Sequence, residues 1–417
     1  MPGCALLARE PNVTVTPLSC AEAGGSNVSG PMVAPRQFCL GHSCLLSDAV
    51  LQARPGARPN VTLSATALSL AYKASYTGQL HEPLCQPACT VRGLTVYFGI
   101  TMLSPYHFFR DNVKHLLVAL HSHGITAVGD TQEWPLRTPA GIAGRQRAPL
   151  RLLLSNRNLP PAAIVGYLSA VTMQPIWTMP EAPACVRFEH LLMGVLGANP
   201  KWQTRTGETL AGPLTKGLGV RHCPPAPSGL LSSGQAQRPR ITLLLRTCAS
   251  HGVSLGRKVL NPAEVETALG ELGSVRRASF ESVGLKEQLN TMLQTDVLVG
   301  VHGAGLSNAM FLHRCGLVIE MWPLGRQPAA PYSEFHANYV SYHDTFCNAS
   351  VEVTCDFNRT RNDHHATYRP LLVDTDRLVR LVRSHLSKWR SCAFQRDTSA
   401  RSVEVLRHVL RRSKKKP

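Results

Sequence analysis

One segment constrains the fold of this 417-residue chain more than any other: DVLVGVHGAGLSN, from Asp296 to Asn308. It opens with a short apolar run, of the kind that forms a strand buried on both faces of a parallel sheet. The glycines that follow predict a tight turn, and Ser307 starts a short expected helix. A strand, a glycine turn and a helix start are the parts of an α/β fold, in which ligands bind beyond the carboxyl ends of parallel strands.

The same alternation of strand and helix runs through two long stretches of the chain. In the first stretch we expect strands over 94–100, 150–154 and 176–179, and helices over 105–120 and 161–171. In the second we expect strands over 241–245, 274–280, 296–301 and 317–321, and helices from 261, over 285–293, over 307–312 and over 374–389. Strands that alternate with helices predict βαβ units, and hence a parallel sheet in each stretch.

Composition marks the boundaries between the expected domains. Residues 1–90 are rich in Pro, Gly, Ser and Cys, which predicts an irregular N-terminal stem or lobe, and residues 223–240 have the composition of a linker. Residues 91–222 and 241–395 then form two domains, and residues 396–417 form a basic tail. The expected fold class is therefore α/β, with two Rossmann-like domains that face each other across a cleft.

The charge of the chain favours an anionic partner. Lys and Arg number 44 against 26 Asp and Glu, which gives a net charge of +18. Such an excess suits a phosphorylated ligand, an anionic membrane face or nucleic acid, although it also serves solubility. Aromatic residues make up 6% of the chain and no nucleic-acid module is recognisable, so we expect no nucleic-acid partner.

Cysteines and glycosylation sequons point to the secretory pathway. The chain has 13 cysteines and five Asn-x-Ser/Thr sequons, at Asn12, Asn27, Asn60, Asn348 and Asn358. Together they predict disulfide bonds, N-glycosylation and residence in the lumen of the Golgi or endoplasmic reticulum. Neither a signal peptide nor an apolar run of membrane-spanning length is present in the sequence, so we expect any membrane attachment to depend on an N-terminal anchor absent from it.

Candidate ligand-binding residues follow the expected strands of the second stretch. Arg246 ends the strand 241–245, and the glycine turn ends the strand 296–301. An arginine can fork two donors onto phosphate oxygens, and N–H groups at a helix start can bind an anion. Glu320, near the end of the strand 317–321, can accept hydrogen bonds from ribose hydroxyls. The predicted nucleotide-binding residues are Arg246, Arg257, Lys258, His302, Gly303, Ala304, Gly305, Ser307, Asn308 and Glu320.

Each of these features alone also has a purely structural interpretation. A glycine turn can serve only the passage from strand to helix, and a strand-ending arginine is usually a surface residue. Glu320 can be a structural hydrogen-bonding group. The prediction of a nucleotide site therefore depends on their common position at one edge of one sheet.

Four segments of the second stretch resemble the C-terminal half of glycosyltransferase family 61. They are RPRITLLLR (238–246), RKVLNPAEV (257–265), DVLVGVHGAGLSNAMFL (296–312) and VIEMWP (318–323). The first stretch is similar to the family more loosely, through PYHFFRDN (105–112) and CVRFEHLLMG (185–194). The resemblance implies a GT-B architecture, inversion at the anomeric carbon and a UDP-sugar donor. A UDP-xylose or UDP-N-acetylglucosamine donor and a glycan or glycoprotein acceptor would follow from it.

An inverting transfer needs a general base for the acceptor hydroxyl, and the first stretch offers one pair. His107 and Asp111 are four residues apart, which puts both on one face of the expected helix 105–120. Either residue can be the base, with the other orienting it. The structural alternative is that His107 packs against the sheet and Asp111 caps or pairs locally.

No cofactor is expected to be required, and a divalent cation remains an alternative. The only Asp-x-Asp pair, Asp374 and Asp376, stands where a helix begins, and so we expect it to cap that helix. The alternative to an active transferase is a catalytically inactive member of the same fold, which only binds glycans or nucleotides.

Overall fold

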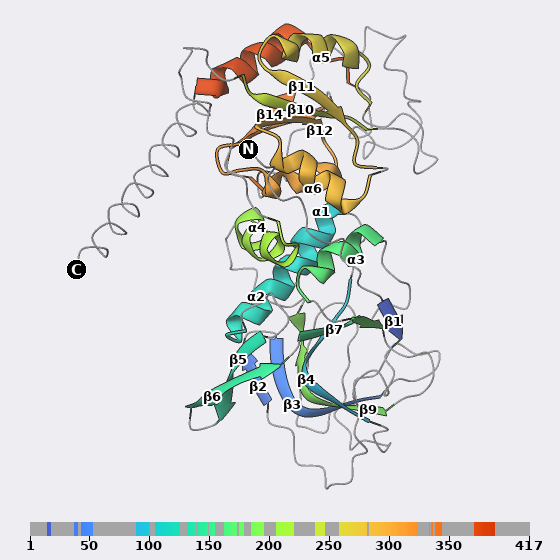
Figure 1. Ribbon diagram of the computed structural model, residues 1–417, viewed down its shortest axis with the longest axis vertical. Coiled ribbons are helices and arrows are strands. Elements are labelled where there is room, and N and C mark those ends of the chain that lie inside the picture. The colour runs from blue at the N-terminus through green and yellow to red at the C-terminus, as the bar shows by residue number, and fades with distance from the viewer. Residues whose placement is uncertain are drawn as a thin grey trace, which may run out of the picture. The chain divides into compact units, whose positions relative to one another are not determined.

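The computed structural model is a mixed α/β protein whose chain divides into two compact units. Residues 5–221 form the N-terminal unit, and residues 222–417 with 1–4 form the C-terminal unit. Each unit has a sheet of its own (Figure 1). The structure describes residues 15–17, 37–40, 43–52, 89–100, 105–125, 132–138, 141–148, 150–154, 162–172, 175–178, 185–195, 206–220, 238–246, 258–281, 283–323, 333, 335–336, 338–343 and 371–387.

The N-terminal unit is built on a seven-stranded sheet. Its strands are β1 (Val15–Pro17), β2 (Gln37–Leu40), β3 (Ser43–Gln52), β4 (Cys89–Phe98), β7 (Leu150–Leu154), β8 (Ile176–Thr178) and β9 (Cys185–Met193). They lie in the order β1-β8-β7-β4-β9-β3-β2. In this order, the five strands from β1 to β9 are parallel to one another. At one edge, β3 pairs antiparallel with β9, and β2 pairs antiparallel with β3. A separate hairpin joins β5 (Gln132–Thr138) to β6 (Gly141–Ala148).

The sequence predicts an irregular segment over residues 1–90, and here the structure differs. Three strands of that segment, β1, β2 and β3, belong to the sheet. The longest of them, β3, pairs with β9, from Cys44 opposite Met193 to Gln52 opposite Cys185. The partner strand lies more than 130 residues away in the chain, as those register pairs imply. Local composition cannot reveal hydrogen bonds that such a distant strand supplies.

A long helix follows the central strand β4 and contains a wider turn. It consists of α1 (Pro105–His107), a π-helical turn (Phe108–Val113) and α2 (Lys114–Ser122). Phe108 and Phe109 are fully buried and pack with Tyr167 of α3 (Ala162–Ser169), with ring centroids 6.5 and 4.6 Å apart. A π-helical turn shifts the face that the residues present, and such turns are frequent at functional sites. The last helix of the unit is α4 (Thr206–Gly217).

The C-terminal unit has a five-stranded sheet in which every neighbouring pair is parallel. Its strands are β10 (Arg240–Leu244), β11 (Ser274–Ala278), β12 (Val297–Val301), β13 (Leu317–Trp322) and β14 (Tyr339–His343). They lie in the order β11-β10-β12-β13-β14. The second strand therefore lies on one side of the first, and the third, fourth and fifth lie on the other. This is a doubly wound fold whose topological switch point falls between β10 and β12.

Helices cover both faces of this sheet. Figure 1 shows α5 (Pro262–Gly270) and the helix over 375–387 on one face, and α6 (Leu285–Leu293) on the other. The core under the first two helices takes alternate residues of the strands, such as Ile241 and Leu243 of β10. Leu378 and Leu386 of the 375–387 helix pack into the same core. In the described part of the chain, no helix is long and apolar enough to cross a membrane.

Candidate functional site

The switch point of the C-terminal unit brings Arg246 together with the glycine turn that follows β12. Arg246 lies two residues beyond the end of β10, and His302 and Gly303 directly follow β12. Because β10 and β12 are adjacent and parallel, their carboxyl ends meet at one edge of the sheet. In doubly wound folds the ligand crevice opens at this point, where the loops of the two strands diverge to opposite faces.

Arg246 lies against the backbone of Gly303. A Cβ atom added to Gly303 would come within 3.3 Å of Nη1 of Arg246. The Nε of Arg246 donates a hydrogen bond to Glu281 Oε1 at 3.2 Å, and the arginine side chain is 35% exposed. Glu281 thus holds the guanidinium from its Nε side beside the glycine turn. Sequence reasoning missed Glu281, although it follows β11, the strand beside β10, by only three residues.

Gly305, the second glycine of the turn, lies close to side chains of the sheet and of the segment after β11. A Cβ on Gly305 would meet Leu244 Cδ2 at 3.3 Å and Phe280 Cδ2 at 3.5 Å. The absence of a side chain at Gly305 therefore lets η3, a 3₁₀ helix over Ala304–Phe311, approach the sheet closely. The structure thus gives Gly305 a packing role, and its predicted contact with the nucleotide stays a prediction.

The start of η3 differs in form from the predicted helix over 307–312. It begins at Ala304, and the Leu306 N–H donates to the Gly303 carbonyl at 3.0 Å. Ser307 is fully buried, and its Oγ has no hydrogen-bond partner among the described residues. Asn308 is also buried, and its Nδ2 donates to Gln288 Oε1 of α6 at 2.9 Å. Asn308 therefore fixes η3 to α6.

His302 is held by a buried carboxylate. Its Nδ1 lies 2.5 Å from Glu320 Oε1, and its ring stacks on Trp322 with centroids 4.0 Å apart. The hydroxyl of Tyr339 donates to the other carboxylate oxygen, Oε2. Burial and the neighbouring Glu320 carboxylate raise the pKa of Tyr339 well above its usual value. The cluster joins the carboxyl end of β12 to β13 and β14.

The predicted role of Glu320 therefore needs correction. Its side chain is 0% exposed, and its two oxygens are bonded to His302 and Tyr339. A ribose hydroxyl cannot reach a carboxylate buried in this way. Tyr339 was missed from the sequence because β14 carries no strong strand pattern, and so its position beside Glu320 was not predictable.

The structure describes one of the two remaining predicted residues, Lys258. Lys258 is exposed, and its carbonyl accepts a hydrogen bond from the Leu371 N–H at 2.8 Å. Within the described part of the chain, no hydrogen bond joins it to Arg246 or His302. Arg257 lies outside the described residues, as do the sequons at Asn12, Asn27, Asn60, Asn348 and Asn358.

His107 and Asp111 form a bonded pair in the N-terminal unit. His107 Nδ1 lies 2.7 Å from Asp111 Oδ2, and their side chains are 38% and 39% exposed. His107 ends α1, Asp111 lies in the π-helical turn, and the long helix follows the central strand β4 of the sheet. Arg110 donates to the Tyr106 hydroxyl at 3.0 Å beside them. The two side chains thus share one accessible face, as expected, and are not packed against the sheet.

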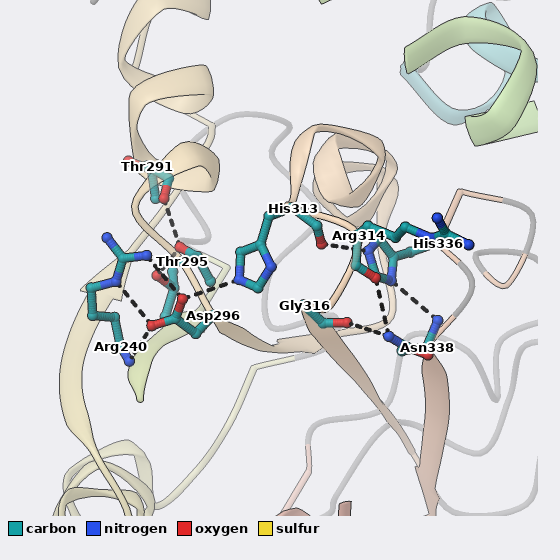
Figure 2. A network of polar contacts seen from close by, with 10 residues as sticks. Arg240, Thr291, Thr295, Asp296, His313, Arg314, Gly316, His336 and Asn338 are labelled. Atoms are coloured by element: carbon teal, nitrogen blue, oxygen red, sulfur yellow. Dashed lines mark hydrogen bonds and ion pairs between the residues drawn. The ribbon is translucent and has the colours of Figure 1, made fainter. Parts of the chain in front are cut away.

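The opposite edge of the C-terminal sheet carries a structural network (Figure 2). Asp296, at the start of β12, accepts three hydrogen bonds of 2.8–2.9 Å from the backbone N–H and guanidinium of Arg240. His313 Nε2 lies 3.0 Å from the same carboxylate. Burial alone would raise the pKa of Asp296, yet the bonds from Arg240 and His313 hold it well below its usual value. The network lies at the amino ends of the strands, and so it stabilises the sheet away from the candidate ligand site.

The Asp374 carboxylate caps a helix in the structure. The described residues contain no group of three or more His, Cys, Asp or Glu side chains arranged to hold a metal ion. Asp374 Oδ1 accepts a hydrogen bond from the Arg377 N–H at 2.9 Å, at the start of the helix over 375–387. The prediction that Asp374 caps this helix is confirmed.

Comparisons with known proteins agree on one family. The model of the family Glycosyltransferase 61 matches residues 106–319, about half of the chain. Beta-1,2-xylosyltransferase XAX1 of Oryza sativa subsp. japonica is 30% identical over 124 residues, which cover 27% of this chain and 20% of that protein. EGF domain-specific O-linked N-acetylglucosamine transferase of Drosophila melanogaster is 33% identical over 86 residues, which cover 21% of this chain and 16% of that protein.

The matched segments thus span about a fifth or less of these relatives. Among solved structures, the dodecameric iron-containing heptosyltransferase TibC in complex with ADP-D-beta-D-heptose aligns with 72% of this chain and 76% of its own. The TM-score of that alignment is 0.31 and the identity is 14%.

Proposed function

The chain belongs to glycosyltransferase family 61, and we propose that it moves a sugar, with inversion, from a UDP-sugar to a hydroxyl group of a glycan or glycoprotein. The observation that carries the proposal is the contact of Arg246 with Gly303 at the switch point of the C-terminal sheet. A guanidinium group beside a glycine turn and the start of a helix can donate several hydrogen bonds to a diphosphate. The relatives' names contain xylosyl and N-acetylglucosamine transfer, so UDP-xylose and UDP-N-acetylglucosamine are the first donors to test.

The pair of His107 and Asp111 supplies the general base in this proposal. The acceptor oxygen attacks the anomeric carbon, the bond from that carbon to the diphosphate breaks, and UDP leaves with the electron pair. The proton of the acceptor hydroxyl passes to the base. The short bond between His107 Nδ1 and Asp111 Oδ2 suits either order, with one residue as base and the other as its orienting partner.

No metal is required in this proposal. Arg246 and the N–H groups at the start of η3 neutralise the charge that develops on the leaving UDP. A requirement for a divalent cation, which would supply the positive charge instead, is the alternative. Activity that is lost with EDTA and restored by added cation would favour that alternative.

The proposal also includes an architecture and a compartment. Each unit has a largely or wholly parallel sheet with helices, as each half of a GT-B enzyme does. The Golgi or endoplasmic reticulum lumen is the proposed location. Cys315 takes part in a disulfide bond, and such bonds persist in oxidising compartments. The five sequons support the same location.

A donor screen with purified protein tests the proposal. UDP-xylose, UDP-N-acetylglucosamine and other UDP-sugars are incubated with glycan and glycopeptide acceptors, with and without EDTA, and released UDP is measured. We expect release of UDP from one donor and transfer of its sugar to an acceptor. UDP binding without hydrolysis or transfer would indicate an inactive, binding member of the family. A protein that neither binds UDP nor turns over any of the donors would contradict the proposal.

A further inference from the structure

The cluster around Glu320 is more elaborate than a strand-to-helix turn requires. A fully buried carboxylate accepts from a histidine and a tyrosine at once, on three neighbouring strands or their ends. Burying a carboxylate is costly unless hydrogen bonds compensate, and here two do. A carboxylate that orients a histidine through Nδ1 is a recurring arrangement at sites where Nε2 meets a ligand.

We propose that Glu320 and Tyr339 are positioning residues that hold His302 so that its Nε2 binds the donor diphosphate beside Arg246. The inference rests on the proposed function and extends it to residues that do not touch the ligand. Glu320 acts through His302, and Tyr339 acts through Glu320.

Two neighbouring side chains orient the imidazole ring of His302. With Nδ1 turned to Glu320 at 2.5 Å, the ring presents Nε2 on its opposite side. Stacking on Trp322, at 4.0 Å and 24° between planes, restricts rotation of the imidazole about its axis. The side chain is 13% exposed. Carboxylate and aromatic partners together therefore fix one orientation.

His302 is the neighbour of Gly303 in the chain, at the candidate diphosphate site. His302 precedes Gly303, whose backbone lies against the Arg246 guanidinium. In this proposal a ligand held by Arg246 over Gly303 also meets the adjacent histidine. In this proposal a phosphate oxygen accepts a hydrogen bond from Nε2, while Glu320 contacts Nδ1. Tyr339 satisfies the second carboxylate oxygen, so Glu320 stays in place when the ligand arrives.

Two substitutions at His302 test the roles of its two ring nitrogens separately. In His302→Asn the amide can still reach Glu320 but not the ligand, whereas in His302→Gln the longer side chain carries an amide near the position of Nε2. Glu320→Gln and Tyr339→Phe remove the charge and the hydroxyl with little change in volume. UDP, UMP and uridine are titrated against each purified full-length variant by calorimetry or ligand-observed NMR, and melting temperatures report folding.

We expect His302→Asn and Glu320→Gln to weaken UDP binding by about tenfold, the effect of one lost charge-assisted bond. His302→Gln should recover part of the loss, and Tyr339→Phe should show a smaller loss of a few-fold. Uridine binding should stay unchanged in all four, because it has no phosphate for His302.

Equal losses for UDP and uridine, or no loss in Glu320→Gln, would overturn the inference and leave Glu320 a structural residue. Melting temperatures separate either result from misfolding, and His302→Gln provides a mild variant should Glu320→Gln fold poorly. Failure of the wild-type protein to bind UDP at all would instead count against the proposed function.

Discussion

Arg246 and Gly303 meet where two parallel strands of the C-terminal sheet end. A side chain at position 303 would begin 3.3 Å from the Nη1 of Arg246, so the guanidinium lies on the bare backbone of the turn. The two residues are 57 positions apart in the chain, and the pairing of β10 with β12 brings them together. Their contact gives the candidate diphosphate site a defined place, and the predictions below follow from it.

Adding a methyl group at Gly303 should impair ligand binding without unfolding the protein. In Gly303→Ala the new carbon crowds Arg246 and the space above the turn. We expect about fivefold weaker UDP binding, or roughly 1 kcal/mol, with little change in melting temperature. Calorimetric titration with UDP measures it. Gly270→Ala is the matched control because a Cβ there meets nothing within 4 Å, and equal UDP affinity in both variants would contradict the placement of the ligand.

Removing either member of the His107 and Asp111 pair should slow transfer but leave the donor site intact. We expect His107→Ala and Asp111→Asn to lower kcat by about 10²–10⁴-fold, the usual contribution of a general base. UDP affinity should not change, because both residues lie in the N-terminal unit and the donor residues lie in the C-terminal unit.

The larger of the two losses identifies the base. Lys114→Ala, on the same helix, serves as the control variant. A wild-type kcat in both His107→Ala and Asp111→Asn would exclude the pair from catalysis.

The Asp296 carboxylate should make stability depend on pH under acid conditions. Its pKa in the folded protein lies below the ordinary value of about 3.9. The folded state therefore gains stability above that ordinary value, and the gain is lost as pH falls below it toward the lower folded pKa. Asp296→Asn should lower the free energy of unfolding near neutral pH by about 2 kcal/mol, because Arg240 and His313 lose the charged carboxylate to which they are bonded.

Denaturant titration at several acid pH values measures this effect. The wild-type protein should lose stability between roughly pH 4 and pH 2, and the slope should be shallower in Asp296→Asn. Asp376→Asn, at an exposed position, is the control. Identical slopes in the wild-type protein and Asp296→Asn would show that the network of Figure 2 contributes no such stability.

Much of the C-terminal unit was predictable because three of its strands, β10, β12 and β13, are short and almost wholly buried runs. The strand expected over 241–245 is β10, at Arg240–Leu244, and the one expected over 317–321 is β13, at Leu317–Trp322. Both are apolar on two faces, which only a buried parallel strand requires. The order of the strands was not predictable, since it depends on pairing between segments far apart in the chain.

The meeting of Arg246 with the glycine turn was predictable, whereas the contacts around it were not. Arg246 and the glycine turn follow from the rule for carboxyl ends of parallel strands. The role of Glu320 was wrong because the sequence does not show that Tyr339 and His302 take both carboxylate oxygens. Glu281 was missed for the same reason: its bond to Arg246 depends on β11 lying beside β10.

The central claim is that Arg246 binds the diphosphate of a UDP-sugar, and a UDP titration of Arg246→Ala tests it most directly. The control is Arg380→Ala, which removes an exposed arginine from the helix over 375–387 of the same unit. We expect the wild-type protein and Arg380→Ala to bind UDP equally, and Arg246→Ala to bind it at least about tenfold more weakly. Wild-type affinity in Arg246→Ala would show that Arg246 does not bind the diphosphate.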